Sequence, residues 1–285
     1  MADVQLDYTV PAADLSEYIT LFYYFQADVP VFQDTERADH AQIRFRLSPG
    51  GAEYRFPDGS VQQSSETHVI GPTSGAMQVR AEGPVRVFGM GVTAVGWATM
   101  IGNDASSMLN RVIDATTLLG APRVRAAAAA LRASPGIPTH VAIGEAFVRE
   151  LVSRGDVGAM RFVRQVDGWL AGSPSPDMDD LIDVTGLSRR QVERKCNALY
   201  GAPPKLLARK YRALRAAVAM VSDSESLDDL IDRGFYDQSH LIREVKQFTG
   251  LTPRQIRAEP TLLSRLTIAQ RTALGGKVSP LISDT

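Results

Sequence analysis

The sequence holds one cysteine, Cys196, and no long apolar run. A single cysteine excludes an internal disulfide framework and suits a reducing compartment. No stretch approaches the roughly 18 apolar residues that a membrane-spanning helix requires. Residues 1–5 also lack the basic-then-apolar layout of a signal peptide. These absences argue against a secreted disulfide scaffold and against a membrane protein, and we expect a cytoplasmic protein.

Residue clusters that would make an enzyme site are missing as well. No nucleophile–base pair stands out, and Ser48-Pro49-Gly50-Gly51 lacks the Lys-Ser/Thr pair of a phosphate-binding loop. The histidines show no metal-ligand spacing. They are His40, His68, His140 and His240. The sequence therefore predicts no catalytic residue, no metal site and no cofactor.

The net charge of −1 conceals an uneven distribution of charge along the chain. Residues 1–120 hold 7 Lys and Arg against 14 Asp and Glu, a balance of −7. Residues 188–215 hold nine basic residues and one acid, Glu193. Such segregation is the usual footprint of a DNA-binding face beside an acidic sensor domain. A solvated basic helix face would have the same charge, so the motifs have to decide between the two.

Strand patterns and helix patterns occupy different parts of the chain. Over residues 1–100, short apolar stretches alternate with Gly/Pro turns such as Pro57-Asp58-Gly59. From about residue 105 onward the apolar spacing is helical, and a Pro- and Ser-rich linker follows. We expect an α+β fold with a β-rich sensor or dimerisation domain over 1–170 that ends in helices, a linker at 171–176, an all-α domain over 177–265 and a C-terminal tail over 266–285.

An internal repeat follows the linker. Residues 180–204 align with residues 229–253 at a constant offset of 49, with seven identities in 25 positions. The identities pair Asp180-Leu181-Ile182-Asp183 with Asp229-Leu230-Ile231-Asp232, Arg194 with Arg243, Gly201 with Gly250 and Pro204 with Pro253. Two copies are too few for a solenoid, which needs at least three. The repeat therefore indicates a duplicated supersecondary unit.

Each copy predicts a short helix, a turn and a longer helix. In the first copy Gly186 supplies the turn and Ser188 caps the longer helix, with Gln191 at capping-box spacing. In the second copy Asp237 is the expected cap. The inward faces of the longer helices hold Val192, Cys196 and Leu199, and Leu241, Val245 and Phe248. A short helix, a turn and a second helix with a polar outer face form the helix-turn-helix signature.

One basic helix, expected over 204–222, joins the two units. About 18 residues span roughly 27 Å, which would place the two longer helices about one DNA turn apart. We expect base contacts from the outward polar residues of both longer helices. These are Arg190, Glu193 and Arg194, and Gln238, Ser239 and Arg243. Expected phosphate contacts, or alternatively solvated charges, are Lys195, Lys205, Arg209 and Lys210. Further candidates for DNA contact are Arg189, Asn197, His240 and Lys246.

Over about 175–260 these residues resemble the AraC/XylS family of bacterial transcription regulators. The most specific stretch is Gly234-Phe235-Tyr236-Asp237-Gln238-Ser239-His240-Leu241, followed by Arg243, Lys246, Gly250, Thr252-Pro253 and Arg257. The sequence departs from the family at Cys196, Leu241 and Val245, where the family often has Phe, yet all three stay apolar. The resemblance implies a sequence-specific regulator, activating or repressing, that binds promoter or operator DNA at the nucleoid and is not an enzyme.

The N-terminal part resembles a sensor domain of some family members. The resembling pieces are 48–53, Val69-Ile70-Gly71-Pro72 and Val85-Arg86-Val87-Phe88-Gly89. A strand-rich shell with aromatic side chains could enclose a small-molecule effector, although such residues more often fill a core. The candidate ligand contacts are Tyr18, Phe22, Tyr24, Phe45 and Phe56. RNA polymerase and a second copy of the chain are further candidate partners.

Two other classes of function compete with this hypothesis. A small-molecule-binding, enzyme-like protein would need a nucleophile–base pair or a metal cluster, and the sequence shows neither. An interaction regulator without DNA binding would not need the basic outer face of 188–215. Cys196 falls on an inward helix face, so a small core residue is favoured over a redox switch there.

Overall fold

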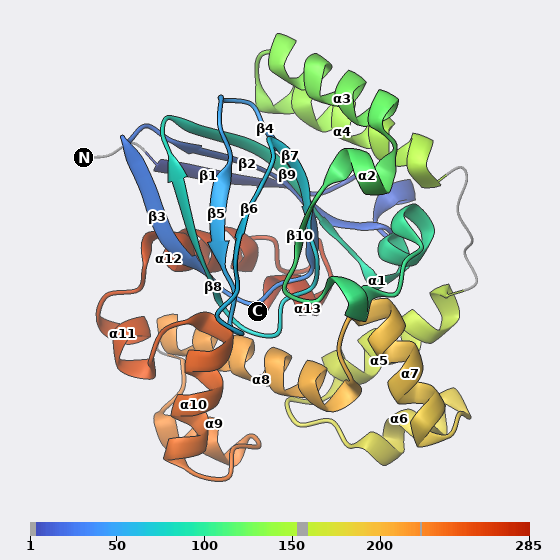
Figure 1. Cartoon of the computed structure of the whole chain (residues 1–285). Coiled ribbons are helices and arrows are strands. Elements are labelled where there is room, and N and C mark those ends of the chain that lie inside the picture. The colour runs from blue at the N-terminus through green and yellow to red at the C-terminus, as the bar shows by residue number, and fades with distance from the viewer. Residues whose placement is uncertain (1–3, 153–158, 223) are drawn as a thin grey trace.

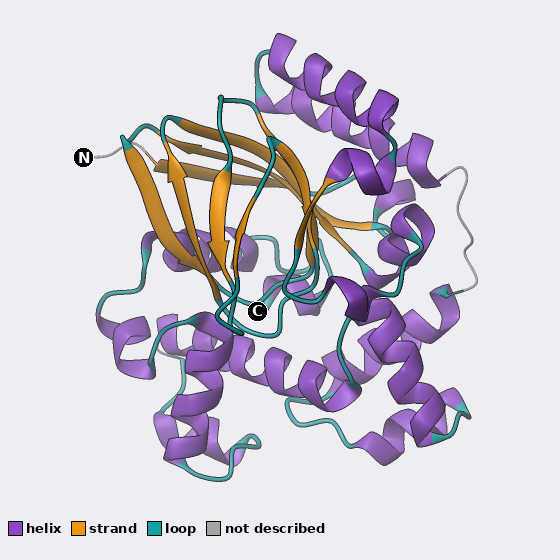
Figure 2. Ribbon diagram, viewed as in Figure 1, coloured by secondary structure: helices purple, strands orange, loops and turns teal. Residues whose placement is uncertain are grey.

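Strands occupy the first part of the chain and helices the rest, which confirms the predicted α+β organisation (Figure 2). The computed structural model describes residues 4–152, 159–222 and 224–285. The strands are β1 (Val4–Thr9), β2 (Ile19–Ala27), β3 (Val31–Glu36), β4 (Ala41–Arg46), β5 (Ala52–Arg55), β6 (Val61–Gln63), β7 (Thr67–Ile70), β8 (Met77–Glu82), β9 (Val85–Val92) and β10 (Val112–Asp114). The helices are α1 (Ala94–Gly96), α2 (Ala115–Leu119), α3 (Ala121–Ala133), α4 (Ile137–Val152), α5 (Met160–Gly172), α6 (Met178–Thr185), α7 (Arg189–Tyr200), α8 (Pro204–Val221), α9 (Leu227–Asp232), α10 (Gln238–Thr249), α11 (Pro253–Ala258), α12 (Leu262–Thr272) and α13 (Pro280–Ser283).

The described strands form two antiparallel sheets that face each other. The larger sheet has the order β1-β2-β9-β4-β7-β10, and the smaller has the order β3-β8-β5-β6. Side chains of both sheets share one apolar core, in which the rings of Phe25 on β2 and Phe32 on β3 lie 4.9 Å apart. The N-terminal part is therefore a two-layer β structure with a common interior.

Strand β4 shows how the larger sheet uses its two faces. Its sequence, Ala-Gln-Ile-Arg-Phe-Arg, alternates apolar and polar residues, which usually indicates one buried and one solvated face. Here all six residues are buried. Ile43 and Phe45 belong to the core on the outer side of the sheet, whereas Gln42, Arg44 and Arg46 line the space between the sheets. A polar layer thus lies inside the N-terminal domain.

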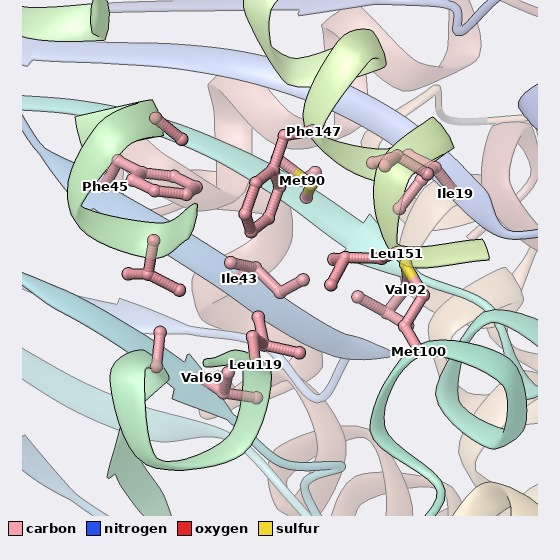
Figure 3. Packing of buried hydrophobic residues seen from close by; sticks show 14 of the residues in the cluster. Ile19, Ile43, Phe45, Val69, Met90, Val92, Met100, Leu119, Phe147 and Leu151 are labelled. Atoms are coloured by element: carbon pink, nitrogen blue, oxygen red, sulfur yellow. The ribbon is translucent and has the colours of Figure 1, made fainter. Parts of the chain in front are cut away.

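Helices α2, α3 and α4 cover the outer face of the larger sheet. Figure 3 shows Ile43, Phe45 and Val69 beside Leu119 of α2 and Phe147 of α4. The rings of Phe45 and Phe147 meet edge to face at 5.5 Å, a favoured aromatic geometry. This apolar contact holds the helical part of the expected 1–170 region on the sheet.

Helices α6 to α11 form the two predicted helix-turn-helix units. Ser188 and Gln191 make the predicted capping box at the start of α7. Asp237 caps α10, since its carboxylate accepts a hydrogen bond from the His240 amide. Between the units, α8 is one continuous helix of 18 residues. The cap residues identified in the sequence therefore mark the true starts of both longer helices.

Helix α5 precedes the expected linker but packs against the first helix-turn-helix unit. Val166 and Leu170 of α5 are buried in the same core as Val192 of α7. The end of α5 is also tied to α8, because Arg215 donates a hydrogen bond of 2.6 Å to the Leu170 carbonyl oxygen. We therefore propose that α5 belongs to the helix-turn-helix domain and that this domain begins before 171–176.

The C-terminal segment folds back onto the N-terminal part of the chain (Figure 1). Helix α12 begins at Leu262, runs across the expected boundary at 265 and lies along β1 and β3. Helix α13 packs against α5 and buries Leu281 and Ile282. Residues 266–285 are thus part of the folded body.

The shared core predicts that the helix-turn-helix domain needs α5 to fold. We expect a fragment of residues 159–261 to unfold cooperatively on heating, and a fragment of 173–261 to lack a cooperative transition. The shorter fragment loses four buried apolar side chains, Phe162, Val163, Val166 and Leu170, each worth about 1.5–3 kcal/mol. Circular dichroism at 222 nm measures both transitions, and equal melting curves would show that α5 is dispensable.

Candidate functional site

The outward faces of α7 and α10 are exposed and polar. On α7 the side chains of Arg190, Glu193 and Arg194 are exposed, and on α10 those of Gln238 and Arg243 are. The inward faces are closed, since Val192, Cys196, Leu241, Val245 and Phe248 are fully buried. Each helix is therefore fixed by its apolar side and leaves its polar side exposed to solvent.

A groove runs between the two units, along one side of α8. Figure 1 shows the units at opposite ends of α8. The groove has a volume of about 750 Å³, and its walls come from both units and from α8. Its charged lining residues are Arg189, Glu193, Lys205, Arg209, Arg212, Arg243 and Glu244. Five of these are basic and two are acidic, so the groove suits a polyanion.

A buried carboxylate organises the centre of this groove. Glu244 of α10 is 3% exposed and accepts hydrogen bonds from Arg209 of α8, the shortest at 2.7 Å. Arg212 of α8 lies 3.5 Å from the same carboxylate. These contacts fix the angle between α8 and α10. They also neutralise part of the positive charge that the sequence assigned to DNA.

The remaining predicted DNA contacts lie in several environments. Exposed ones are Arg189, Lys195, Lys205, Ser239 and Lys246, whereas Asn197 and His240 are half-buried. Arg189 pairs with Asp179 at 2.9 Å on an exposed surface. The Lys195 ammonium group lies 5.3 Å from the centre of the Phe162 ring. The His240 ring nitrogen Nδ1 accepts a hydrogen bond from the Tyr236 amide.

Lys210, which the sequence predicts as a phosphate contact or a solvated charge, is buried. It is 7% exposed, and its ammonium group donates a hydrogen bond of 3.4 Å to the main-chain oxygen of Asp39 in the N-terminal domain. Burial lowers the pKa of Lys210 to about 8. In this structure Lys210 therefore joins the two parts of the chain and is not available to a phosphate.

One exposed aromatic residue beside α10 is missing from the sequence-based candidates. Tyr236 precedes the cap of α10 and is 91% exposed. The sequence feature that could have identified Tyr236 is its position, one residue before the cap residue Asp237.

A second site lies between the two sheets. The cavity measures about 100 Å³, and one side of it is apolar. The apolar lining includes Leu6, Phe25, Phe32, Val79, Val85 and Leu263. The polar lining includes Tyr8, Tyr23, Glu36, Arg37, Gln42, Arg44, Tyr54 and His68. A concave site with apolar walls and a few convergent polar groups is the usual form of a small-molecule site.

Arg44 is the centre of the polar lining and is fully engaged. Its guanidinium donates to Glu36 at 2.5 and 2.9 Å, to Tyr23 at 2.8 Å and to Tyr54 at 3.0 Å. The Tyr54 hydroxyl lies 3.1 Å from Nε2 of His68. Burial, with the nearby Arg44 charge, lowers the pKa of His68 to about 3. His68 is therefore neutral, and this cluster carries no net charge.

The five aromatic residues expected to contact a ligand do not line this cavity. Phe22 and Phe45 lie in the core under α4, and Phe56 lies in the core between the sheets. Tyr18 packs against the α5 core, and the ring of Tyr24 stacks on His140 of α4 at 5.7 Å. For Phe22 and Tyr24 the physical reason is the two-residue period of β2, which places both side chains on the face that α4 covers.

Within 4–152, 159–222 and 224–285, no three His, Cys, Asp or Glu side chains cluster as a metal site would require. Among the same residues, no helix is long and apolar enough to cross a membrane.

Comparisons with known proteins bear on the C-terminal helices first. Residues 181–259 match the family described as "Helix-turn-helix domain", which confirms the AraC/XylS resemblance of this region. Searching the curated proteins finds no match. Among solved structures, ToxT from Vibrio cholerae O395 has 8% identity and a TM-score of 0.47, covering 85% of this chain and 98% of ToxT.

Two further solved structures are similar at low identity. ToxT from Vibrio cholerae strain SCE256, bound to an unsaturated fatty acid, has 9% identity and a TM-score of 0.46, covering 84% of this chain and 96% of ToxT. The AraC-like transcriptional activator CuxR has 14% identity and a TM-score of 0.31, covering 75% of this chain and 86% of CuxR.

The Glu244 cluster predicts different effects for two basic residues of α8. Arg209→Ala should lower the free energy of unfolding by about 1–3 kcal/mol, because it removes the nearest counter-charge of a buried carboxylate. Lys205→Ala removes an exposed charge from the same helix and should change it by less than about 0.5 kcal/mol. Urea denaturation of both variants measures the difference. Equal stabilities would contradict a structural role for the Arg209–Glu244 pair.

Proposed function

We propose that this chain is a transcription regulator that binds duplex DNA through α7 and α10. The observation that carries the proposal is the pair of exposed polar helix faces on a duplicated unit, spaced by one helix. An 18-residue α8 spans roughly 27 Å, close to the ~34 Å between successive major grooves once the widths of the recognition helices are added. One chain can then enter two grooves on one side of the duplex.

The exposed residues divide into two roles. Arg190, Arg194 and Arg243 can donate two hydrogen bonds to the edge of a guanine, and Glu193 can accept one from cytosine. Lys205 is exposed at the first turn of α8, where a phosphate contact would orient the helices without reading sequence. We add Tyr236 to the backbone contacts, since its ring stands open beside α10.

We further propose that a small-molecule effector binds the cavity between the sheets. Its lining residues, not the five aromatic residues expected from the sequence, are then the ligand contacts. The support is the enclosed polar layer of β4, which a purely structural sandwich would not need. Contacts with RNA polymerase and with a second copy of the chain stay predictions.

The two contact roles predict two kinds of binding defect. Using a DNA site selected from a random library, Arg194→Ala should weaken binding by about 1–3 kcal/mol and relax the preference at one or two base pairs. Lys205→Ala should weaken all DNA sequences about equally and make the salt dependence shallower by about one unit. Fluorescence anisotropy over a series of salt concentrations measures both.

Arg125→Ala is the matched control for both variants. Arg125 is exposed on α3, which lies at the opposite end of the molecule from α7 and α10 (Figure 1). The control should bind as the wild type does. The proposal fails if the full chain retains no DNA at low salt, or if the Arg194 and Lys205 variants bind as the control does.

A further inference from the structure

One wall of the inter-sheet cavity comes from the far end of the chain. Leu263, Ser264 and Thr267 of α12 line the cavity, together with strands of both sheets. The strand walls are held by ladders of main-chain hydrogen bonds between neighbouring strands. A helix forms its main-chain hydrogen bonds within itself and needs none to the sheets. Moving α12 therefore breaks fewer main-chain hydrogen bonds than moving a strand.

A small number of polar contacts fix α12 over the cavity. The Leu263 amide donates a hydrogen bond of 2.9 Å to the Asp34 carboxylate at the start of the helix. Near its other end Arg271, which is 6% exposed, donates to both carboxylate oxygens of Asp39 at 2.5 and 3.3 Å. Although burial opposes ionisation, the Arg271 guanidinium holds the pKa of Asp39 well below its usual range. The pair is thus ionised and binds α12 to the segment that follows β3.

The guanidinium group of Arg37, which lines the cavity, has unsatisfied hydrogen-bond donors. Its guanidinium atoms Nε and Nη2 are buried and have no hydrogen-bond partner among the described residues. The neighbouring carboxylates are already engaged, Glu36 by Arg44 and Asp39 by Arg271. Two unsatisfied buried donors on a charged group carry a large free-energy penalty unless a ligand meets them.

The other basic lining residues differ from Arg37 in this respect. Arg44 is surrounded by Glu36, Gln42 and two tyrosine hydroxyl groups. Arg46 donates to the main-chain oxygens of Gly51 and Glu82. Among the basic lining residues, the unsatisfied buried hydrogen-bond donors of the described structure therefore belong to Arg37.

We propose that the cavity binds a small organic anion with an apolar body, that Arg37 pairs with its single anionic group, and that α12 is the wall that yields to admit it. The volume of the cavity supports the proposed movement of α12. A cavity of about 100 Å³ is below the ~300 Å³ at which sites for drug-sized ligands begin. A ligand larger than a benzene ring therefore requires α12 to shift outward.

The effect of such a ligand on DNA binding rests on the proposed function. Only residues 259–261 separate α12 from α11, the last helix of the second helix-turn-helix unit. A ligand that moves α12 therefore acts directly on the unit that carries α10. The ligand and the DNA contact are then linked, provided that the ligand binds the two positions of α12 with different affinity.

A matched pair of dyes tests the anion site without knowledge of the natural ligand. 8-Anilinonaphthalene-1-sulfonate has an apolar body with one anionic group, and N-phenyl-1-naphthylamine is its neutral counterpart. We expect the sulfonate to bind the full chain saturably at one site. Arg37→Gln should weaken its affinity about tenfold or more and change the affinity of the neutral dye less than about threefold. No saturable binding, or equal losses for both dyes, would overturn the proposal.

Two substitutions on α12 test whether that helix forms the ligand wall. Ser264→Phe places a ring in the cavity from α12 and should abolish sulfonate binding. Arg265→Phe places the same ring on an exposed position of the same helix and should leave binding unchanged. Melting curves by circular dichroism verify that both variants are folded. If both bind the sulfonate as the wild type does, α12 is not a wall of the site.

The dye measurements need no DNA, so they fail independently of the proposed function. If the wild-type chain retains DNA but does not bind the sulfonate, the anion site alone is refuted. Normal, Arg37-dependent dye binding in a chain that retains no DNA would refute the DNA-binding role and leave the anion site standing.

Discussion

The structure depends on five consecutive residues, Glu36–His40, which lie between the inter-sheet cavity and the helices of the helix-turn-helix units. Glu36 pairs with Arg44 inside the cavity, and Asp39 pairs with Arg271 of α12. Ala38 is fully buried, and its amide donates a hydrogen bond of 2.7 Å to the main-chain oxygen of Phe248 on α10. The Nε2 atom of His40 lies 3.0 Å from the Tyr211 hydroxyl of α8. One short segment thus contacts the cavity, α8, α10 and α12 at once.

Each helix-turn-helix unit is therefore supported from outside itself. The first shares its core with α5 and with Ala94 and Val95 of α1. The second meets the N-terminal domain, where the Ala76 amide donates to the Gln247 carbonyl oxygen at 2.8 Å. Phe248 is buried among Ala38, Ala213 and Leu214. Residues 36–40 thus link the cavity directly to α10, because Glu36 lines the cavity and the Ala38 amide is bonded to Phe248.

Local sequence signals predict the helices of the helix-turn-helix units, but they do not predict the residues that line the cavity. Caps such as Ser188 and Asp237, and apolar spacing such as Leu241 to Val245, act within a few residues, so the sequence alone reveals them. The cavity depends on pairing between distant strands. The alternation in β4 predicts one polar face, yet only the second sheet and α12 turn that face into a buried one. In β2 the aromatic residues were recognised, but the strand face was not. Tyr23 and Phe25 face the cavity, whereas Phe22 does not.

If Glu36–His40 and α12 couple the cavity to the second helix-turn-helix unit, a ligand in the cavity should change the protection of both regions. Amide hydrogen exchange of the full chain, with and without saturating 8-anilinonaphthalene-1-sulfonate, measures this coupling. We expect altered protection in 36–40, in α12 and at the end of α10, with α6 and α7 unchanged. Changes confined to the strands around the cavity, with none in α10 or α12, would refute the coupling.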